Sequence, residues 1–144
     1  MRLLRLFILP LFVFILIACG GQDRKVSDEP LTDRQIKYGI GPIDSVKLGS
    51  IDAQMANRGE RIFRSVCMKC HTLDQAVLGP PLRDVTNRRA PEFIMNVILN
   101  PQDNVMRHPE LQKYHKIYNN YMTDQGLDST AARAILEYLR REAP

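Results

Sequence analysis

The stretch Cys67-Met68-Lys69-Cys70-His71 decides how the rest of the chain is organised. Two cysteines three positions apart, with a histidine directly after the second, are the sequence signature of covalent haem attachment. On a helical turn the two thiols share one face, so both can reach the vinyl groups of one porphyrin. The imidazole of His71 is then placed to bind the iron. The motif therefore predicts one covalent haem c held by Cys67, Cys70 and His71.

Two other uses of such a motif find little support elsewhere in the chain. A structural zinc site needs four ligands, usually arranged as two separated pairs, and the sequence has no second Cys/His pair. A redox-active CxxC belongs in a strand–helix–strand context, and no strand pattern is visible. Haem attachment is the interpretation that the surrounding sequence favours.

Length and composition describe a single folded domain. The chain has 144 residues, of which 44% are hydrophobic and 25% charged, as in ordinary globular proteins. The net charge of +4 is mild and forms no concentrated basic stripe, so nucleic-acid binding is not expected. The three cysteines all have other uses, and no disulfide is expected.

Residues 1–18 have the pattern of an export signal peptide. Arg2 and Arg5 precede an uninterrupted apolar run, Leu6–Ala18. This run is shorter than the roughly 20 residues that span a bilayer, and its length is typical of a signal peptide. We therefore expect the mature protein to lie outside the cytoplasm.

The apolar run ends Leu16-Ile17-Ala18-Cys19, which resembles a bacterial lipobox. The resemblance implies cleavage before Cys19 and attachment of lipid to its sulfur, and so a membrane-anchored lipoprotein on the periplasmic face. Gly20 stands where an aspartate would favour the inner membrane, so the outer membrane is slightly favoured if the source has one. The alternative is an ordinary signal peptide cleaved at another small residue.

The sequence divides the mature chain into a tether, residues 19–50, and a folded domain, residues 51–144. The tether is rich in charged residues, glycine and proline and has no sustained apolar period. Two alternatives stay open for residues 38–48. They form part of a coil, or their apolar side chains pack on the domain as a strap.

Four helices and no strands are expected in the domain, so the predicted fold is all-α. Asp52 and Asp128 are N-cap candidates, and Pro91 is suited to a first helical position. Apolar residues recur at helical spacing in each segment, and in the third Leu111, Tyr114 and Ile117 are expected on one side. The segments are about 51–66, 91–99, 109–118 and 128–141.

Three residues outside the motif are candidates for orienting His71 or for pairing with a haem propionate. A ligating histidine nearly always donates its second ring N–H to a fixed acceptor. The carbonyl of Pro80 is the candidate acceptor for His71, because proline carbonyls accept although proline donates no hydrogen bond. Arg88 or Arg89 is a candidate partner for a haem propionate.

The segment from about residue 51 to residue 141 resembles the small single-haem cytochromes c of class I. The order of features matches: a helix with Gly59 and Phe63, the haem motif, Gly79-Pro80, a short middle helix, a methionine loop and a last helix. The resemblance implies the cytochrome c fold, about four short helices around one covalent haem. It also implies that the first and last helices cross, with Gly59 against Tyr138 and with Phe63 and Ile135 nearby.

The family's sixth iron ligand is a methionine in the loop before the last helix, which in this chain is Met122. The family often has proline after this methionine, and here the residue is Thr123. Met106, expected in another loop, is an alternative. His108 and His115 are further alternatives, although both are otherwise expected at the solvent-exposed surface. An open sixth position also stays possible.

The resemblance implies an electron carrier rather than an enzyme. It would pass single electrons between a donor and an acceptor redox protein of the respiratory chain, while tethered to the membrane through Cys19. One alternative is a haem enzyme or gas-binding domain with an open iron site. Another is a fixed cytochrome subunit of a terminal oxidase or a nitrogen-oxide reductase. More loosely, the chain resembles monohaem lipoproteins that accompany nitrous-oxide reductases.

Overall fold

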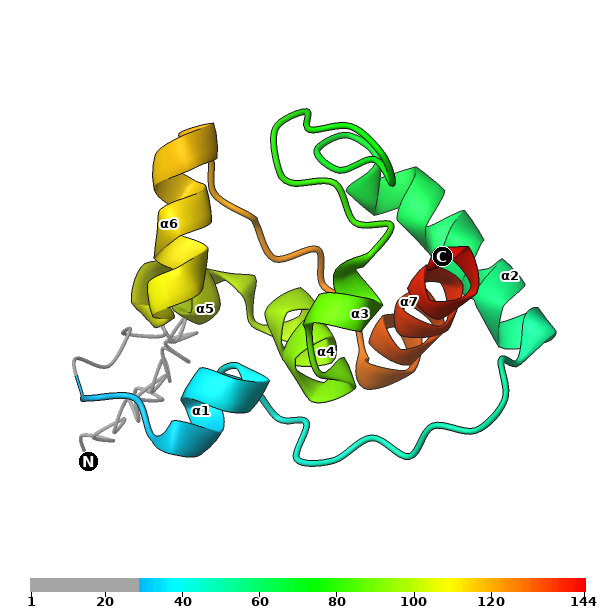
Figure 1. Cartoon of the computed structure of the whole chain (residues 1–144), viewed down its shortest axis with the longest axis horizontal. Coiled ribbons are helices and arrows are strands. Elements are labelled where there is room, and N and C mark those ends of the chain that lie inside the picture. The colour runs from blue at the N-terminus through cyan, green and yellow to red at the C-terminus, as the bar shows by residue number, and fades with distance from the viewer. Residues whose placement is uncertain (1–28) are drawn as a thin grey trace, which may run out of the picture.

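The computed structural model describes residues 29–144, and within them every element of regular secondary structure is a helix (Figure 1). The predictions for the export signal and for lipid on Cys19 lie outside the described residues. The α-helices are α1 (Asp33–Tyr38), α2 (Ala53–Ile62), α3 (Val85–Arg88), α4 (Pro91–Leu99), α5 (Pro101–Arg107), α6 (Pro109–Tyr118) and α7 (Ser129–Glu142). A π-helical turn, η1 (Phe63–Cys67), continues α2 into the haem motif. The all-α prediction is confirmed.

Strands and membrane-spanning helices are both missing from this part of the chain. The extended pairing found within residues 29–144 is an isolated bridge between His71 and Ala76. Over the same residues, every helix is too short or too polar to cross a bilayer.

The helix ends follow from the capping residues that the sequence shows. Asp52 accepts a hydrogen bond from the Met55 N–H at 2.9 Å, and Asp128 accepts one from the Ala131 N–H at 2.7 Å. These bonds satisfy N–H groups that the first turn of a helix leaves without partners. Asn119 ends α6 with a left-handed backbone (φ 48°).

Helices α2 and α7 cross in backbone contact at Gly59. A Cβ atom on Gly59 would lie 1.9 Å from the carbonyl oxygen of Ala134, so only glycine permits this approach. The atoms nearest that position belong to the backbone of Ala134 and Ile135. One turn further along α7, Tyr138 packs on Phe63, with ring centroids 5.2 Å apart. The crossing falls between small residues because an aromatic side chain would hold the two backbones apart.

The core lies where α2–η1 and α4 pack on α7. Its buried side chains are mainly aliphatic, and Phe63 closes it beside the haem motif. The buried members of the cluster are Phe63, Ile94, Met95, Ile98, Ala132, Ile135, Leu136, Tyr138 and Leu139.

Glu137 is fully buried on α7 and joins that helix to the start of α2. Its carboxylate accepts a hydrogen bond from the Asp52 N–H at 2.9 Å and forms ion pairs with Arg133 and Arg140. Burial acts to raise the pKa of Glu137, but the hydrogen bonds from Arg133, Asp52 and Arg140 together hold it below its usual value.

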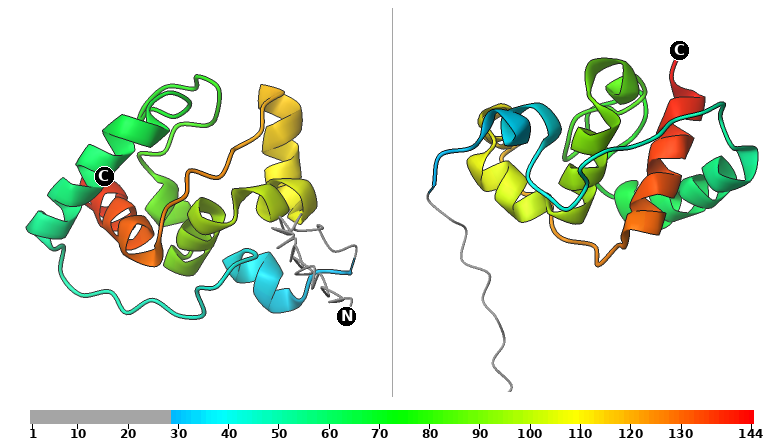
Figure 2. Two further views of the ribbon diagram at one scale, coloured as in Figure 1. Left: turned by 180° about the vertical axis from the view of Figure 1, so that it is seen from behind. Right: turned by 90° about the horizontal axis from the view of Figure 1, so that it is seen from below.

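Residues 38–48 pack on the domain, so the strap is the alternative that the structure shows. The N–H groups of Ile40, Ile43 and Val46 donate to the side chains of Asn104 (2.9 Å), Asn96 (2.8 Å) and Glu92 (2.8 Å). The folded part of the chain therefore begins before residue 51, with α1 included (Figure 2).

His108 fastens α1 to the start of α6. Its Nε2–H donates to the Ile36 carbonyl at 2.9 Å, and its Nδ1 accepts from the Glu110 N–H at 3.3 Å. The side chain is 3% exposed, so the expectation of a solvent-exposed His108 is wrong. Burial became possible because α1 covers the imidazole.

The sequence also missed α3 and α5. Helix α5 begins at Pro101, directly after Asn100 ends α4. The proline that was expected only to stop α4 therefore also starts α5. Met106 therefore lies in a helix and not in the expected loop, and its side chain is 47% exposed.

We expect Gly59→Ala to lower the free energy of unfolding by about 3 kcal/mol, because the added methyl group forces the α2 and α7 backbones apart. Urea unfolding of the haem-loaded protein measures this. Arg58→Ala, at the exposed neighbouring position, is the control and should change stability by less than about 0.5 kcal/mol. Equal effects of the two substitutions would contradict a backbone contact at Gly59.

We expect Glu137→Gln to destabilise the protein in a pH-dependent manner. Because the folded-state pKa of Glu137 lies below its unfolded value, its charge adds stability above the unfolded pKa and loses it as pH falls through the folded pKa. Wild type should exceed the variant by about 2 kcal/mol near pH 7 and converge with it in acid. A difference that is constant with pH, or grows in acid, would refute this role.

Candidate functional site

An apolar cavity of about 200 Å³ lies in the middle of the helices. Its walls come from η1, from α3 to α7, and from the segments after the haem motif and after α6. Cys67, Cys70, His71 and Met122 all line it, although they are distant in sequence. Aliphatic and aromatic wall residues include Phe63, Val66, Leu82, Ile94, Ile98 and Leu139.

The haem motif reaches this cavity because η1 widens the end of α2. The Met68 N–H donates to the Phe63 carbonyl at 3.0 Å, five residues back, and the next bonds return to tighter turns, with the N–H groups of Cys70 and His71 both donating to Cys67 O. Such π-turns occur frequently at functional sites. Here the turn leaves both cysteines and His71 on the cavity wall.

His71 is held in one orientation by the residues after the motif. Its Nδ1–H donates to the carbonyl of Pro80 at 2.9 Å, which is the acceptor expected from the sequence. A Cβ atom on Gly79 would lie 2.4 Å from the imidazole Cε1, so a side chain there would displace the ring. With Nδ1 occupied, Nε2 is the nitrogen left for a metal.

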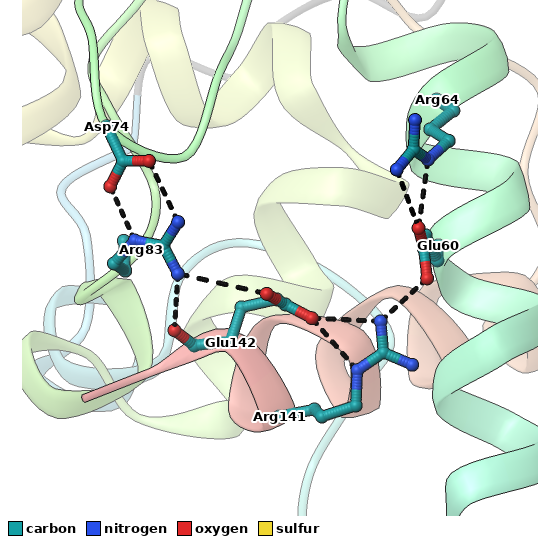
Figure 3. A network of polar contacts seen from close by, with 6 residues as sticks. All are labelled: Glu60, Arg64, Asp74, Arg83, Arg141 and Glu142. Carbon is teal, nitrogen blue, oxygen red and sulfur yellow. Dashed lines mark hydrogen bonds and ion pairs between the residues drawn. The ribbon is translucent and has the colours of Figure 1, made fainter.

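The loop that carries Pro80 is tied to the helices by a polar network (Figure 3). Arg83, just after the loop, pairs with Asp74 inside it and donates to the Glu142 carbonyl of α7 at 3.0 Å. On α7, Arg141 continues the network to Glu60 of α2 at 2.7 Å. These contacts fix the Pro80 carbonyl relative to the helix that presents His71.

The apolar surroundings of the motif shift the pKa values of Cys67 and His71. Burial, helped by the neighbouring Cys70, raises the pKa of Cys67 to about 11, so its thiol stays protonated at neutral pH. Burial also lowers the pKa of His71, although the hydrogen bond to Pro80 acts the other way, which favours the neutral imidazole that binds metals. Within residues 29–144, no group of three or more His, Cys, Asp or Glu side chains is arranged to hold a metal ion, as zinc would require.

The candidates for the sixth iron ligand are separated by position. Met122 lies on the cavity wall in the segment between α6 and α7. His115 lines the cavity too, with Nδ1 3.0 Å from the Asn120 carbonyl and its ring 3.8 Å from that of Tyr121. It is partly buried and not solvent-exposed as expected. Met106 and His108 do not line the cavity.

Arg88 and Arg89 lie at the cavity wall, but each already has a carboxylate partner. Arg88 pairs with Asp84 at 2.8 Å, and Arg89 pairs with Glu110 of α6. Either arginine would therefore share its charge between that carboxylate and a haem propionate.

Helix α6 lines the cavity with a different set of residues from the predicted Leu111, Tyr114 and Ile117. Leu111, Tyr114 and Tyr118 line the cavity, whereas Ile117 is 70% exposed and points elsewhere. The spacing of 111, 114 and 118 follows one helical face. The predicted set ended at Ile117, three residues after Tyr114, and the observed set ends at Tyr118, four residues after it. Both spacings are helical, so hydropathy alone could not decide between them.

The residues present fit a covalently bound haem. Two thiols and an oriented imidazole share one apolar cavity, and glycine at position 79 leaves room for that imidazole. Cys67 and Cys70 would hold the porphyrin by thioether bonds, and His71 would bind the iron.

Comparison with known proteins agrees with this reading of the site. Residues 56–142 match the family model of cytochrome c. A 46-residue segment is 41% identical to cytochrome c2 of Rhodopseudomonas palustris and covers 32% of this chain and 32% of that protein. The chain thus matches about a third of the length of that relative.

Two solved structures are similar over most of their length. Cytochrome c from Rhodothermus marinus is 48% identical, with a TM-score of 0.73 over 76% of this chain and 96% of that one. An engineered cytochrome c from the same organism, bound to a carbene intermediate, is 45% identical with a TM-score of 0.69 and the same coverage.

We expect Gly79→Ala to disturb the site, because its methyl group would push the His71 imidazole off the Pro80 carbonyl. The yield of covalently haem-loaded protein should fall, and the midpoint potential of the loaded fraction should shift. Gly49→Ala is the control, since a Cβ atom there meets nothing within 4 Å. An unchanged yield and potential in Gly79→Ala would show that the close approach is unimportant.

Proposed function

The chain belongs to the cytochrome c family, and from this premise we propose that it is a membrane-anchored carrier of single electrons. Haem-based electron transfer is the function that family membership supports. The finer proposal is that His71 and Met122 bind the iron, that lipid on Cys19 holds the protein at a membrane outside the cytoplasm, and that redox proteins of the respiratory chain are its partners.

The observation that carries the ligand proposal is the placement of His71 and Met122 on the walls of one apolar cavity. The haem supplies a one-electron couple, and a thioether ligand in apolar surroundings favours the ferrous state. The protein's own residues keep this environment constant. Pro80 orients His71, the thioether links of Cys67 and Cys70 would prevent loss of the cofactor, and the aliphatic walls exclude water.

Exposed apolar side chains at the edge of the cavity support docking of a redox partner. Leu78 is 51% and Tyr121 52% exposed while lining the cavity, and Val77 beside them is 50% exposed. Apolar edges of this kind mark interaction sites. We propose that electrons enter and leave through this edge during brief docking.

An enzyme or gas-binding domain is the second candidate, and it requires an exchangeable iron site. His115, the other potential ligand on the cavity wall, would also close the site. A methionine-bound, histidine-bound and open iron differ in their spectra, so the candidates are separable. A fixed subunit of a terminal oxidase or nitrogen-oxide reductase would share the closed iron and differ in its stable association.

We expect the ferric protein to show the weak long-wavelength absorption band of iron–methionine ligation, and Met122→Ala to lose it and bind cyanide rapidly. Met106→Ala is the matched control, because Met106 is exposed on α5 and away from the cavity. It should retain the band. Rapid cyanide binding by wild type, or an unchanged Met122→Ala spectrum, would refute ligation by Met122.

We expect Cys19→Ser to move the protein from the membrane fraction to the soluble extracytoplasmic fraction, because the lipid attachment point is removed. Cell fractionation with detection of haem-stained protein measures this. Cys19→Ser that stays with the membrane after high-salt washing would show that lipid on Cys19 is not the anchor.

A further inference from the structure

One open groove is lined by exposed apolar side chains that the haem cavity does not use. Ile117 of α6 is 70% exposed and Ile36 of α1 is 45% exposed, and both line this groove together with Lys113. A single exposed isoleucine is ordinary, but two over one groove indicate a contact surface. We call Ile36, Lys113 and Ile117 the α1–α6 face.

The α1–α6 face and the haem cavity meet at Tyr114 of α6, which lines both the groove and the cavity. At 100° per residue, Lys113 and Ile117 fall opposite Leu111 and Tyr118. Leu111 and Tyr118 line the haem cavity. Ile36, Lys113 and Ile117 themselves do not line the haem cavity.

The described chain enters the domain beside this face. The Glu29 carbonyl accepts a hydrogen bond from Arg107 at the end of α5, at 2.6 Å, and α1 follows, held by His108 at the start of α6. Figures 1 and 2 place α1, α5 and α6 together at one end of the molecule and α2 at the other. The start of the described chain and the exposed isoleucines thus share one end.

The packed strap shortens the connection to Cys19. Residues 20–28 separate Cys19 from Glu29, and at full extension they reach about 35 Å at most. A tether running to residue 50 would reach roughly 100 Å. The strap therefore keeps this end of the domain close to any membrane that holds Cys19.

The charge of the groove suits anionic lipid headgroups. Among the described residues that line it, Glu110 is already paired with Arg89 of the loop before α4, whereas Lys113 has no ion pair. An isoleucine pair beside a lysine can enter the headgroup boundary while the ammonium group meets phosphate.

We propose that the α1–α6 face rests on the lipid surface and so orients the domain, with Leu111 and Tyr118 of α6 on the haem cavity. The proposal rests on the proposed lipid anchor at Cys19. The partner is the phospholipid headgroup layer, contacted by Ile36 and Ile117 and paired with Lys113.

The test uses the lipidated, haem-loaded full-length product in vesicles of phosphatidylcholine and phosphatidylglycerol, and in detergent solution. A water-soluble reagent acylates lysines, and mass spectrometry measures the rate at each site. We expect Lys113 to react about fivefold more slowly on vesicles than in detergent. Lys69, exposed in the haem motif, should react equally in both. Ile117→Asp should restore the acylation rate of Lys113 on vesicles. Val77→Asp, which also replaces an exposed apolar side chain, should not.

The possible failures are distinguishable. If the protein does not float with the vesicles, the lipid anchor is wrong and the orientation falls with it. If it floats but Lys113 reacts as in detergent, the anchor stands and the α1–α6 face does not contact lipid. Protection of Lys113 that rises with the protein-to-lipid ratio would assign the face to a second copy of the chain, and would also overturn the proposal.

Discussion

The backbone contact between Gly59 and Ala134 is the constraint on which the haem site depends. It sets the crossing of α2 and α7, and α2 runs through η1 directly into Cys67. One turn closer to the motif, the packing of Phe63 on Tyr138 holds α2–η1 and α7 in the same relative position. Movement at the crossing would therefore move both cysteines and His71 relative to the walls contributed by α4 and α7. Stability and cofactor geometry are linked at this point, because one contact determines both.

A second set of contacts holds the far wall of the cavity. Asn96 and Asn104 accept hydrogen bonds from the strap, and His108 joins α1 to α6. Helix α6 contributes Leu111 and Tyr118 to the cavity and leads into the segment with Met122. The N-terminal segment thus stabilises the side of the cavity formed by α4, α5 and α6. What the sequence presents as a linker is part of the frame around the haem.

The sequence predicted what depends on local rules. Asp52 and Asp128 cap their helices, and the CxxCH motif names the cofactor, because these signals lie within a few residues of each other. Contacts between distant residues were beyond it. Nothing near Gly59 indicates that the Ala134 carbonyl lies against it, and nothing near Ile40 names Asn104 as its partner. The burial of His108 likewise depends on α1, which lies about seventy residues earlier. From its composition, that segment was predicted to be part of the tether.

The proposed function requires an iron that keeps both axial ligands while it gains and loses one electron. The most direct measurement is a potentiometric titration of the haem-loaded protein followed by visible absorption, with and without cyanide. The account predicts one reversible one-electron transition with a single set of isosbestic points and a midpoint potential that cyanide leaves unchanged. Hysteresis, more than one spectral transition, or a midpoint that falls when cyanide is added would contradict it, because each requires a ligand position that opens during turnover.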